Sequence, residues 1–156
     1  KNCGNVQMME TALMCMALNI FFEARSEPVQ GQIAVAEVTL NRVASEDYPN
    51  TICEVVLQEN KNGCQFSWWC DSKSDLPKEH NSFQTSKSLA KLMIHEGQYI
   101  SVVGKDATHY HTDDIKPYWS DKMVKIEQVG KHIFYAENIN DIKPLPRPEI
   151  ISKLYP

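Results

Sequence analysis

Two consecutive helical stretches near the N-terminus constrain the fold more than any other part of the sequence. Residues 6–25 carry apolar side chains at helical spacing, which predicts an amphipathic helix. This helix is expected to end near residue 24 or 25, because Pro28 disfavours helical geometry at the residue before it. The apolar positions are Met9, Leu13, Met16, Ala17 and Ile20.

The second helix is expected to begin at once and to run to about Ala44. Ser26 or Glu27 is suited to cap it, with Pro28 in its first turn. Its apolar residues are distributed around most of the circumference, and such a helix packs at the centre of a domain rather than on its surface. The main stripe is formed by Ile33, Ala36, Leu40 and Val43.

The remaining elements are shorter, and strands appear only in the last third of the chain. Helices followed by a small antiparallel sheet are typical of a mainly helical α+β domain. We expect a single domain over residues 1–156, with its core at about 6–136 and an extended, proline-containing tail at 137–156. The patterns predict a short helix at Thr51–Gln58, a loop at 59–75, a helix at Ser82–Glu96 ended by Gly97, strands at Thr108–His111, Val124–Gln128 and His132–Tyr135, and a hairpin turn at Gly130 and Lys131.

Charge and hydropathy exclude two classes of partner. The formal net charge is −4 and Lys and Arg are scattered, whereas nucleic-acid binding requires clustered cations. The longest apolar stretch, at 12–22, is far shorter than the ~20 residues of a membrane span. We therefore expect neither nucleic-acid binding nor membrane insertion. We also expect the protein to be a monomer.

The five cysteines bear on the compartment. Cys15 lies inside an apolar helix and is interpreted as a buried free thiol. The other four are disulfide candidates, and four cysteines allow three pairings between which the sequence does not choose. One or two disulfides, and with them an extracytoplasmic location, are favoured over a reduced cytosolic protein. The five residues between Cys64 and Cys70 do not match the usual spacing of a zinc knuckle. The four candidates are Cys3, Cys53, Cys64 and Cys70.

Glu23 is the strongest candidate for a catalytic residue. It follows two phenylalanines at the C-terminal end of an apolar helix, where the helix dipole disfavours an anion. Desolvation by the aromatic rings also favours the neutral carboxyl, so both effects raise its pKa towards the range of a general acid. The alternative is a carboxylate that is paired with an arginine or solvated.

Two further glutamates are candidates for a second carboxylate or a supporting role. Glu27 would repel Glu23 if the helix continued, and helix capping or an ion pair with Arg25 is its more ordinary role. Glu37 lies in the apolar face of the second helix, where a buried, hydrogen-bonded carboxylate is favoured over a catalytic one.

Several ordered blocks of sequence resemble the cell wall hydrolase family of spore-cortex-lytic enzymes (SleB/CwlJ type). The resemblance spans roughly residues 12–136, and the order of the blocks makes it specific. The Trp-Trp block between two cysteines looks more like the bacterial and phage branches of the family than its spore branch. The blocks are residues 17–28, 31–38, 40–43, 48–53, 64–71, 107–111 and 130–135.

The resemblance implies peptidoglycan cleavage on a lysozyme-like or lytic-transglycosylase-like α+β fold. In such folds the acid is a glutamate at the end of a helix, and Glu23 is the residue at that position. The expected partner is the peptidoglycan glycan strand, and no cofactor is expected. The expected location is the periplasm or the cell wall, and a phage could deliver the protein there.

Residues in the predicted loops are candidates for substrate binding. Flat aromatic rings suit sugar faces, and amide and hydroxyl groups can hydrogen-bond sugar hydroxyls. One tryptophan of the adjacent pair is expected to be buried and the other to face the cleft, because neighbours on a strand point to opposite sides. The candidates are Gln65, Phe66, Ser67, Trp68, Trp69, Tyr118 and Trp119.

His109, Tyr110 and His111 complete the candidate site. The two histidines lie two residues apart on a predicted strand and therefore share a face. Two ligands do not make a metal site, so this triplet is expected to orient substrate or a carboxylate through hydrogen bonds.

Four functions remain open at this stage. A lytic transglycosylase that cuts between N-acetylmuramic acid and N-acetylglucosamine is preferred, because only Glu23 stands out among the carboxylates. A muramidase needs a second carboxylate, for which Asp71, Asp106 and Glu37 are candidates. A zinc-dependent N-acetylmuramoyl-L-alanine amidase would use His109 and His111. A non-catalytic wall-binding or virion protein would use none of these residues for chemistry.

Overall fold

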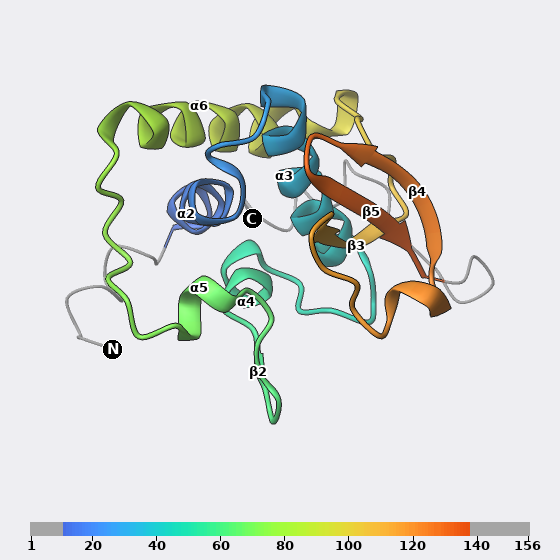
Figure 1. Cartoon of the computed structure of the whole chain (residues 1–156). Coiled ribbons are helices and arrows are strands. Elements are labelled where there is room, and N and C mark those ends of the chain that lie inside the picture. The colour runs from blue at the N-terminus through green and yellow to red at the C-terminus, as the bar shows by residue number, and fades with distance from the viewer. Residues whose placement is uncertain (1–10, 138–156) are drawn as a thin grey trace.

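A computed structural model describes residues 11–137 (Figure 1). Its first described helix, α2 (Ala12–Ala24), begins after Thr11, whose hydroxyl accepts a hydrogen bond from the Met14 amide at 3.2 Å. This cap gives a hydrogen-bond partner to one of the amides of the first turn that have none inside the helix. The expected beginning of the helix at residue 6 lies outside the described residues, and the expected end at Ala24 is confirmed.

The second helix, α3 (Val29–Ala44), is the centre of the molecule. Thirteen of its sixteen residues are buried, as its apolar circumference predicts. It contacts α2, α4 and α6 on one side and strand β3 on the other. The N-cap is Pro28 without a side-chain hydrogen bond, so the expectation of a Ser26 or Glu27 cap was wrong. The Glu27 carboxylate instead reaches the sheet hairpin.

Helix α6 (His80–Glu96) crosses above α2 and α3 in Figure 1. Gly97 ends it as expected and opens a short 3-10 helix, Gly97–Tyr99. Gly97 has right-handed helical backbone angles, so glycine is not required here for a left-handed C-cap. A Cβ at this position would lie 2.8 Å from Leu40 Cδ1, and glycine therefore allows the end of α6 to approach α3 closely.

Three antiparallel strands form the sheet beside α3 in the order β3-β5-β4. The strands are β3 (Ala107–Thr112), β4 (Val124–Val129) and β5 (His132–Ala136), close to the predicted ranges. Gly130 turns the β4–β5 hairpin with φ of +59°, a conformation that glycine adopts without strain. A Cβ there would also collide with the Glu27 carboxylate, because the hairpin rests on this side chain.

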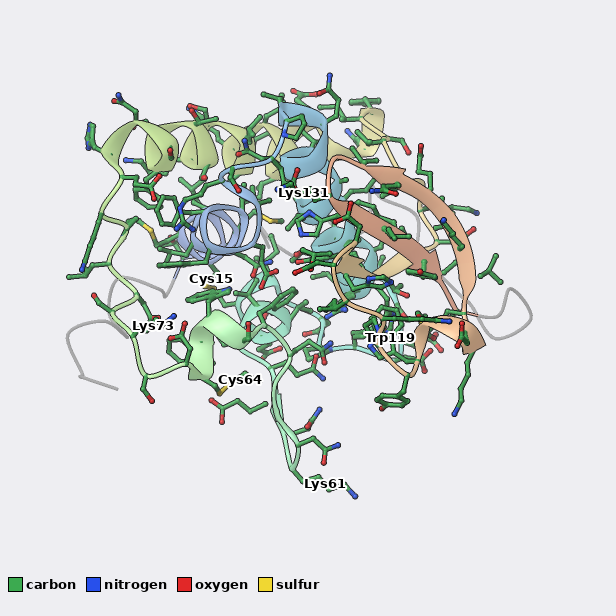
Figure 2. All side chains as sticks on the ribbon, viewed as in Figure 1. Cys15, Lys61, Cys64, Lys73, Trp119 and Lys131 are labelled. Carbon is green, nitrogen blue, oxygen red and sulfur yellow. A yellow bond between two sulfur atoms is a disulfide. The ribbon has the colours of Figure 1, made fainter. Side chains whose placement is uncertain are left out.

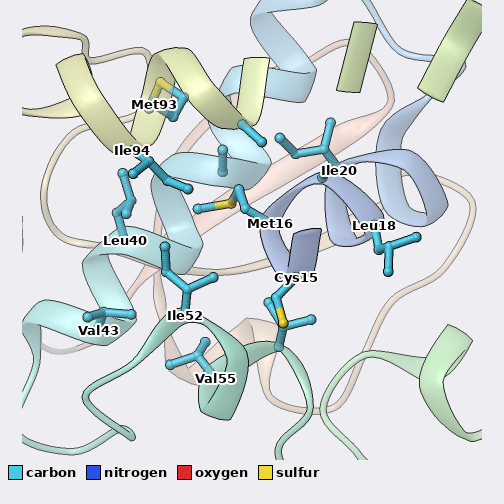
Figure 3. Packing of buried hydrophobic residues seen from close by; sticks show 14 of the residues in the cluster. Cys15, Met16, Leu18, Ile20, Leu40, Val43, Ile52, Val55, Met93 and Ile94 are labelled. Atoms are coloured by element: carbon cyan, nitrogen blue, oxygen red, sulfur yellow. The ribbon is translucent and has the colours of Figure 1, made fainter. Parts of the chain in front are cut away.

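The main core lies between α2, α3, α4 (Ile52–Val56) and α6 (Figure 3). Met16, Ile20, Ile52 and Met93 meet in it with their side chains fully excluded from solvent. A smaller apolar cluster joins α3 to the sheet through Phe134. None of the helices in residues 11–137 has the length and hydropathy required to cross a bilayer.

Two disulfides link the described cysteines. Cys15 bonds Cys53 and so ties α2 to α4, which makes the expected free thiol at Cys15 wrong. Its apolar position obscured the pairing, because a half-cystine is as compatible with a core as a thiol. Cys64 bonds Cys70 as one of the open pairings allowed. Cys3 lies outside the described residues.

The predicted loop at 59–75 contains a small hairpin and a short helix. Strands β1 (Glu59–Asn60) and β2 (Gly63–Cys64) form the hairpin, and α5 (Ser67–Cys70) follows. The Cys64–Cys70 bond closes the segment that contains α5.

Candidate active site

Glu23 lies in the last turn of α2, where two cavities meet. It is half-buried, and no basic residue occupies that turn. Burial raises the pKa of its carboxyl from 4.5 to about 7, against the smaller lowering effects of the Tyr110 hydroxyl and the Arg42 charge. A carboxyl in this environment exists in both protonation states near neutral pH, as an acid that must also act as a base requires.

A partly buried tyrosine and a buried arginine surround this carboxyl. Tyr110, on β3, directs its hydroxyl towards Glu23, and burial raises the pKa of the phenol well above 10.0. The contact is close enough to influence both pKa values, although the phenol oxygen has no partner at full hydrogen-bond geometry within the described residues. The Tyr110 hydroxyl is therefore a polar neighbour of Glu23 that does not fix the carboxyl in one protonation state.

Arg42, on α3, is the cation behind the site. Its side chain is 3% exposed, and its Nε donates to the Thr108 carbonyl at 2.8 Å. The guanidinium lies over the rings of Tyr48 and Phe66, at 5.2 and 5.3 Å from their centroids. Burial lowers the pKa of Arg42, but a guanidinium stays charged at neutral pH. Sequence reasoning missed Arg42, although a single cation inside an apolar helix is a recognisable signal.

The larger cavity, called the main cleft here, has a volume of about 420 Å³. One side comes from the disulfide-closed segment and the other from β3 and the residues that follow it. Figure 2 labels one residue of each side, Cys64 and Trp119. The lining residues are Glu23, Arg42, Cys64, Gln65, Phe66, Ser67, His109, Tyr110, His111, Thr112, Ile115, Pro117, Trp119 and His132.

The two histidines of β3 both face the main cleft and both contact Trp119, at 5.1 and 5.6 Å between ring centroids. His111 has both ring nitrogens in hydrogen bonds, to the Thr112 carbonyl and the Tyr135 hydroxyl. His109 Nδ1 lies 3.0 Å from the Thr108 hydroxyl. Burial and the Arg42 charge lower the pKa of His109 to about 4, so its ring is neutral at pH 7.

Metal-ligand side chains gather at one place in the described part of the chain, and it does not include these histidines. The group consists of Glu59, Cys64 and Cys70. The two sulfurs of this group are bonded to each other, which removes the thiolates that a metal would need. With both nitrogens of His111 engaged, the expected hydrogen-bonding role of the histidine pair fits the geometry better than metal ligation.

The second cavity begins on the other side of Glu23 and has a volume of about 330 Å³. Glu23 and Ser67 line both cavities, so together these form one continuous candidate surface around the carboxyl. The lining residues of the second cavity are Phe22, Glu23, Arg25, Ser67, Trp68, Asp71, Lys73, Ser74 and Asp75.

The adjacent tryptophans lie on a helix, α5, and not on a strand. Trp68 is buried, stacks on Phe22 and donates its indole N–H to Asn19, yet one face of it lines the second cavity. Trp69 lines neither cavity and donates to the Glu59 carboxylate at 3.0 Å. The expectation that one tryptophan is buried is confirmed by Trp68. The expectation that the other faces the cleft was wrong, since helical neighbours do not alternate across a surface.

The remaining two aromatic candidates, Tyr118 and Trp119, differ in their position relative to the cavities. Tyr118 is 84% exposed and lines neither cavity, whereas the adjacent Trp119 lines the main cleft. Gln65, Phe66 and Ser67 all line the main cleft, where residues that bind substrate are expected. Sequence alone did not separate Tyr118 from Trp119, because the turn that precedes the 3-10 helix Ser120–Lys122 decides which ring points inward.

Three candidate carboxylates differ sharply in their surroundings. Glu37 is fully buried and accepts hydrogen bonds from the Ser101 hydroxyl and two backbone amides, away from both cavities. Glu27 lies 3.5 Å from His132 Nδ1 and accepts a hydrogen bond from the Lys131 amide, so it supports the sheet hairpin. Arg25 forms its ion pair with Glu79 and not with Glu27. Only Asp71 lines a cavity together with Glu23.

Comparison with known proteins places the chain in a family. A family model described as cell wall hydrolase matches residues 26–135, a range that begins just after Glu23. The spore cortex-lytic enzyme of Bacillus cereus is 30% identical over 127 residues, which cover 78% of this chain and 43% of that protein. That of Oceanobacillus iheyensis is 30% identical over 122 residues, covering 78% and 40%. This chain thus spans less than half of the length of either relative.

Two solved structures are similar to the whole described fold. The catalytic domain of the germination-specific lytic transglycosylase SleB from Bacillus anthracis superposes with a TM-score of 0.65 at 32% identity, covering 81% of this chain and 94% of that one. The catalytic domain of the Bacillus cereus SleB protein gives 0.60 at 29% identity, covering 80% and 88%. These relatives are of the spore branch, so the expected phage branch gains no support from them. With a family match over more than half of its length, the chain belongs to the cell wall hydrolase family, on the fold of the SleB catalytic domain.

Proposed function

We propose that this chain is a lytic transglycosylase that cuts the peptidoglycan glycan strand between N-acetylmuramic acid and N-acetylglucosamine, with Glu23 as general acid and base. One observation carries the proposal: among the described residues that line the main cleft, Glu23 is the single carboxylate, and its pKa is raised to about 7. Hydrolysis with water ordinarily needs a pair of carboxylates, whereas an intramolecular attack needs one.

The proposed reaction has two proton transfers. Protonated Glu23 donates to the glycosidic oxygen as the bond from that oxygen to C1 of muramic acid breaks. The resulting carboxylate then accepts the proton of the 6-hydroxyl of the same sugar, while its oxygen bonds to C1. The products are a free 4-hydroxyl and a 1,6-anhydromuramic acid end, and Glu23 is again protonated.

The surrounding residues fit this sequence of steps. The Tyr110 hydroxyl orients the Glu23 carboxyl, and the Arg42 charge steadies the carboxylate after it has given up its proton. Neutral His109 can accept a hydrogen bond from a sugar hydroxyl, and Trp119 offers an aromatic surface beside it. The two disulfides fit an extracytoplasmic location.

A muramidase is the second candidate, because the Asp71 carboxylate lines the second cavity with Glu23. Product analysis of digested sacculi separates the two reactions. We expect wild type to release anhydromuramic products and Glu23→Gln to release none, with Glu127→Gln, an exposed glutamate on β4, as the matched control.

Each other outcome would replace the proposal by a named alternative. Reducing muramic ends would indicate a muramidase that uses water. Freed peptides that disappear with a metal chelator would indicate a zinc amidase. Release of nothing soluble by wild type, together with retained binding of Glu23→Gln to sacculi, would indicate a wall-binding protein.

A further inference from the structure

The second cavity differs in chemistry from the main cleft, although both begin at Glu23. Apart from Glu23 and the buried Arg42, the main cleft is lined by aromatic rings, imidazoles, an amide, hydroxyls and apolar side chains, which suit an uncharged sugar. The second cavity adds the charged side chains Arg25, Lys73, Asp71 and Asp75 to an apolar surface from Phe22 and Trp68. In a peptide-bearing strand the lactyl carboxyl is in amide linkage, so the sugar rings offer no charge to these side chains. The charged groups of this cavity therefore fit a different part of the substrate.

Lys73 is the most available charge in this cavity. It is exposed, and its ammonium group is in no ion pair within the described residues. Arg25 is more committed, because its Nε already donates to Glu79 at 2.8 Å and its Nη1 lies near the Phe21 carbonyl. Figure 2 shows Lys73 on the segment between α5 and α6.

The backbone around Lys73 is shaped by local hydrogen bonding. The Asp71 carboxylate accepts from the Lys73 amide at 2.9 Å through one oxygen, and Ser72 between them adopts a left-handed φ of +63°. Within residues 11–137 the second Asp71 oxygen accepts no hydrogen bond, so it can accept one from a bound molecule. The turn therefore presents an ammonium and a carboxylate oxygen side by side at one cavity.

We propose that the second cavity binds the peptide branch of the glycan strand, a short peptide that carries both carboxylate and amino groups. Muramic acid bears this branch on its lactyl group, so a muramic residue held at Glu23 can direct it across Ser67 into the second cavity. Lys73 pairs with a branch carboxylate, and Asp71 accepts from a branch amino or amide group. The inference rests on the proposed function and assigns the substrate class as peptide-bearing strands.

A binding measurement tests this without turnover. Two ligands are titrated into Glu23→Gln by calorimetry. One is N-acetylglucosaminyl-N-acetylmuramic acid with its lactyl carboxyl converted to a primary amide, and the other is the same disaccharide with a tetrapeptide that contains a diamino acid. We expect the tetrapeptide ligand to bind about tenfold tighter. Adding Lys73→Ala should reduce this ratio about threefold, the size of a partly exposed ion pair.

Lys61→Ala is the matched control, since Lys61 lies at the tip of the β1–β2 hairpin and lines neither cavity (Figure 2). It should leave the ratio unchanged. Equal affinity for the two ligands would overturn the inference, and so would equal effects of Lys73→Ala and Lys61→Ala on the ratio.

Turnover provides a second, independent readout. For wild type, kcat/KM should be higher on intact sacculi strands than on strands whose peptides have been removed by an amidase, and Lys73→Ala should reduce this preference. If both substrates are cut equally fast to anhydro products, the peptide site is wrong and the proposed reaction stands. If wild type cuts neither while the tetrapeptide still binds tighter, the reaction is wrong and the peptide site stands.

Discussion

The surroundings of Glu37 and of Glu23 show what one residue type does in two regions of the same molecule. Glu37, at the centre of α3, is fully buried and accepts three hydrogen bonds of 2.8 to 2.9 Å from the segment that leads to β3. Glu23, at the end of α2, faces two cavities and has the Tyr110 hydroxyl as its direct polar neighbour.

The difference lies in how completely the protein replaces water around the carboxylate. Three donors compensate the desolvation of Glu37, so this side chain joins α3 to the segment at residues 101–103. Glu23 is desolvated without such donors, which raises its pKa and leaves its oxygens open to the cavities. The hydrogen bonds of Glu37 stabilise the fold, whereas the surroundings of Glu23 hold a poorly solvated carboxyl that the rest of the fold must keep in place.

The largest expected effect is on the activity of Glu23→Gln. An amide of the same shape cannot donate a carboxylic proton, so kcat/KM should fall about a thousandfold. Because the carboxyl is poorly solvated in the folded state, the melting temperature should stay unchanged or rise. Release of soluble muropeptides and thermal unfolding are the two measurements. Residual activity near the wild-type level would remove Glu23 from the chemistry.

The opposite result is expected for Glu37→Gln. Its amide oxygen can still accept from the Val102 and Val103 amides, but these bonds lose the carboxylate charge, and its NH2 group replaces the oxygen that accepts from the Ser101 hydroxyl. The change should cost about 2–3 kcal/mol of unfolding free energy. For a chain of this size the melting temperature should fall by about 5–10 °C. Denaturant unfolding measures the loss, with Glu127→Gln as an exposed control. An unchanged stability together with lost activity would reverse the assignment of the two regions.

The pH dependence of stability should separate the regions further. The folded pKa of Glu23 lies above its unfolded value of 4.5, so the folded state binds the extra proton between pH 4.5 and about 7. The contribution of Glu23 to stability is therefore fully present below pH 4.5 and is lost as the pH rises through about 7. Subtracting the stability curve of Glu23→Gln from that of wild type isolates this term. A flat difference across the interval would contradict the raised pKa.

The smallest effect is expected from Tyr110→Phe. The Tyr110 hydroxyl lowers the pKa of Glu23, so its removal should raise that pKa. Since the reaction needs the protonated acid, the alkaline limb of the rate profile should move to higher pH. Tyr99→Phe, at a residue 78% exposed, is the control and should leave the limb in place. A shift to lower pH would mean that Tyr110 stabilises the protonated form instead.

Local sequence predicted the helices, the hairpin and the position of Glu23 because these depend on neighbours along the chain. Apolar periodicity defined α2 and α3, Pro28 separated them, and Gly130 marked the turn of the β4–β5 hairpin. The candidate acid followed from two phenylalanines before a glutamate at a helix end. The resemblance of ordered blocks then added the family, which the comparisons confirm.

Tertiary structure alone decided the partners that meet across the chain. The Arg42 charge, the Tyr110 hydroxyl and Glu23 come from α3, β3 and α2, and no local pattern brings these elements together. The same holds for the bond from Cys15 to Cys53. A side chain is defined locally by its own helix or strand, whereas its solvation and its pKa are defined by whatever packs against it, and that depends on the whole fold.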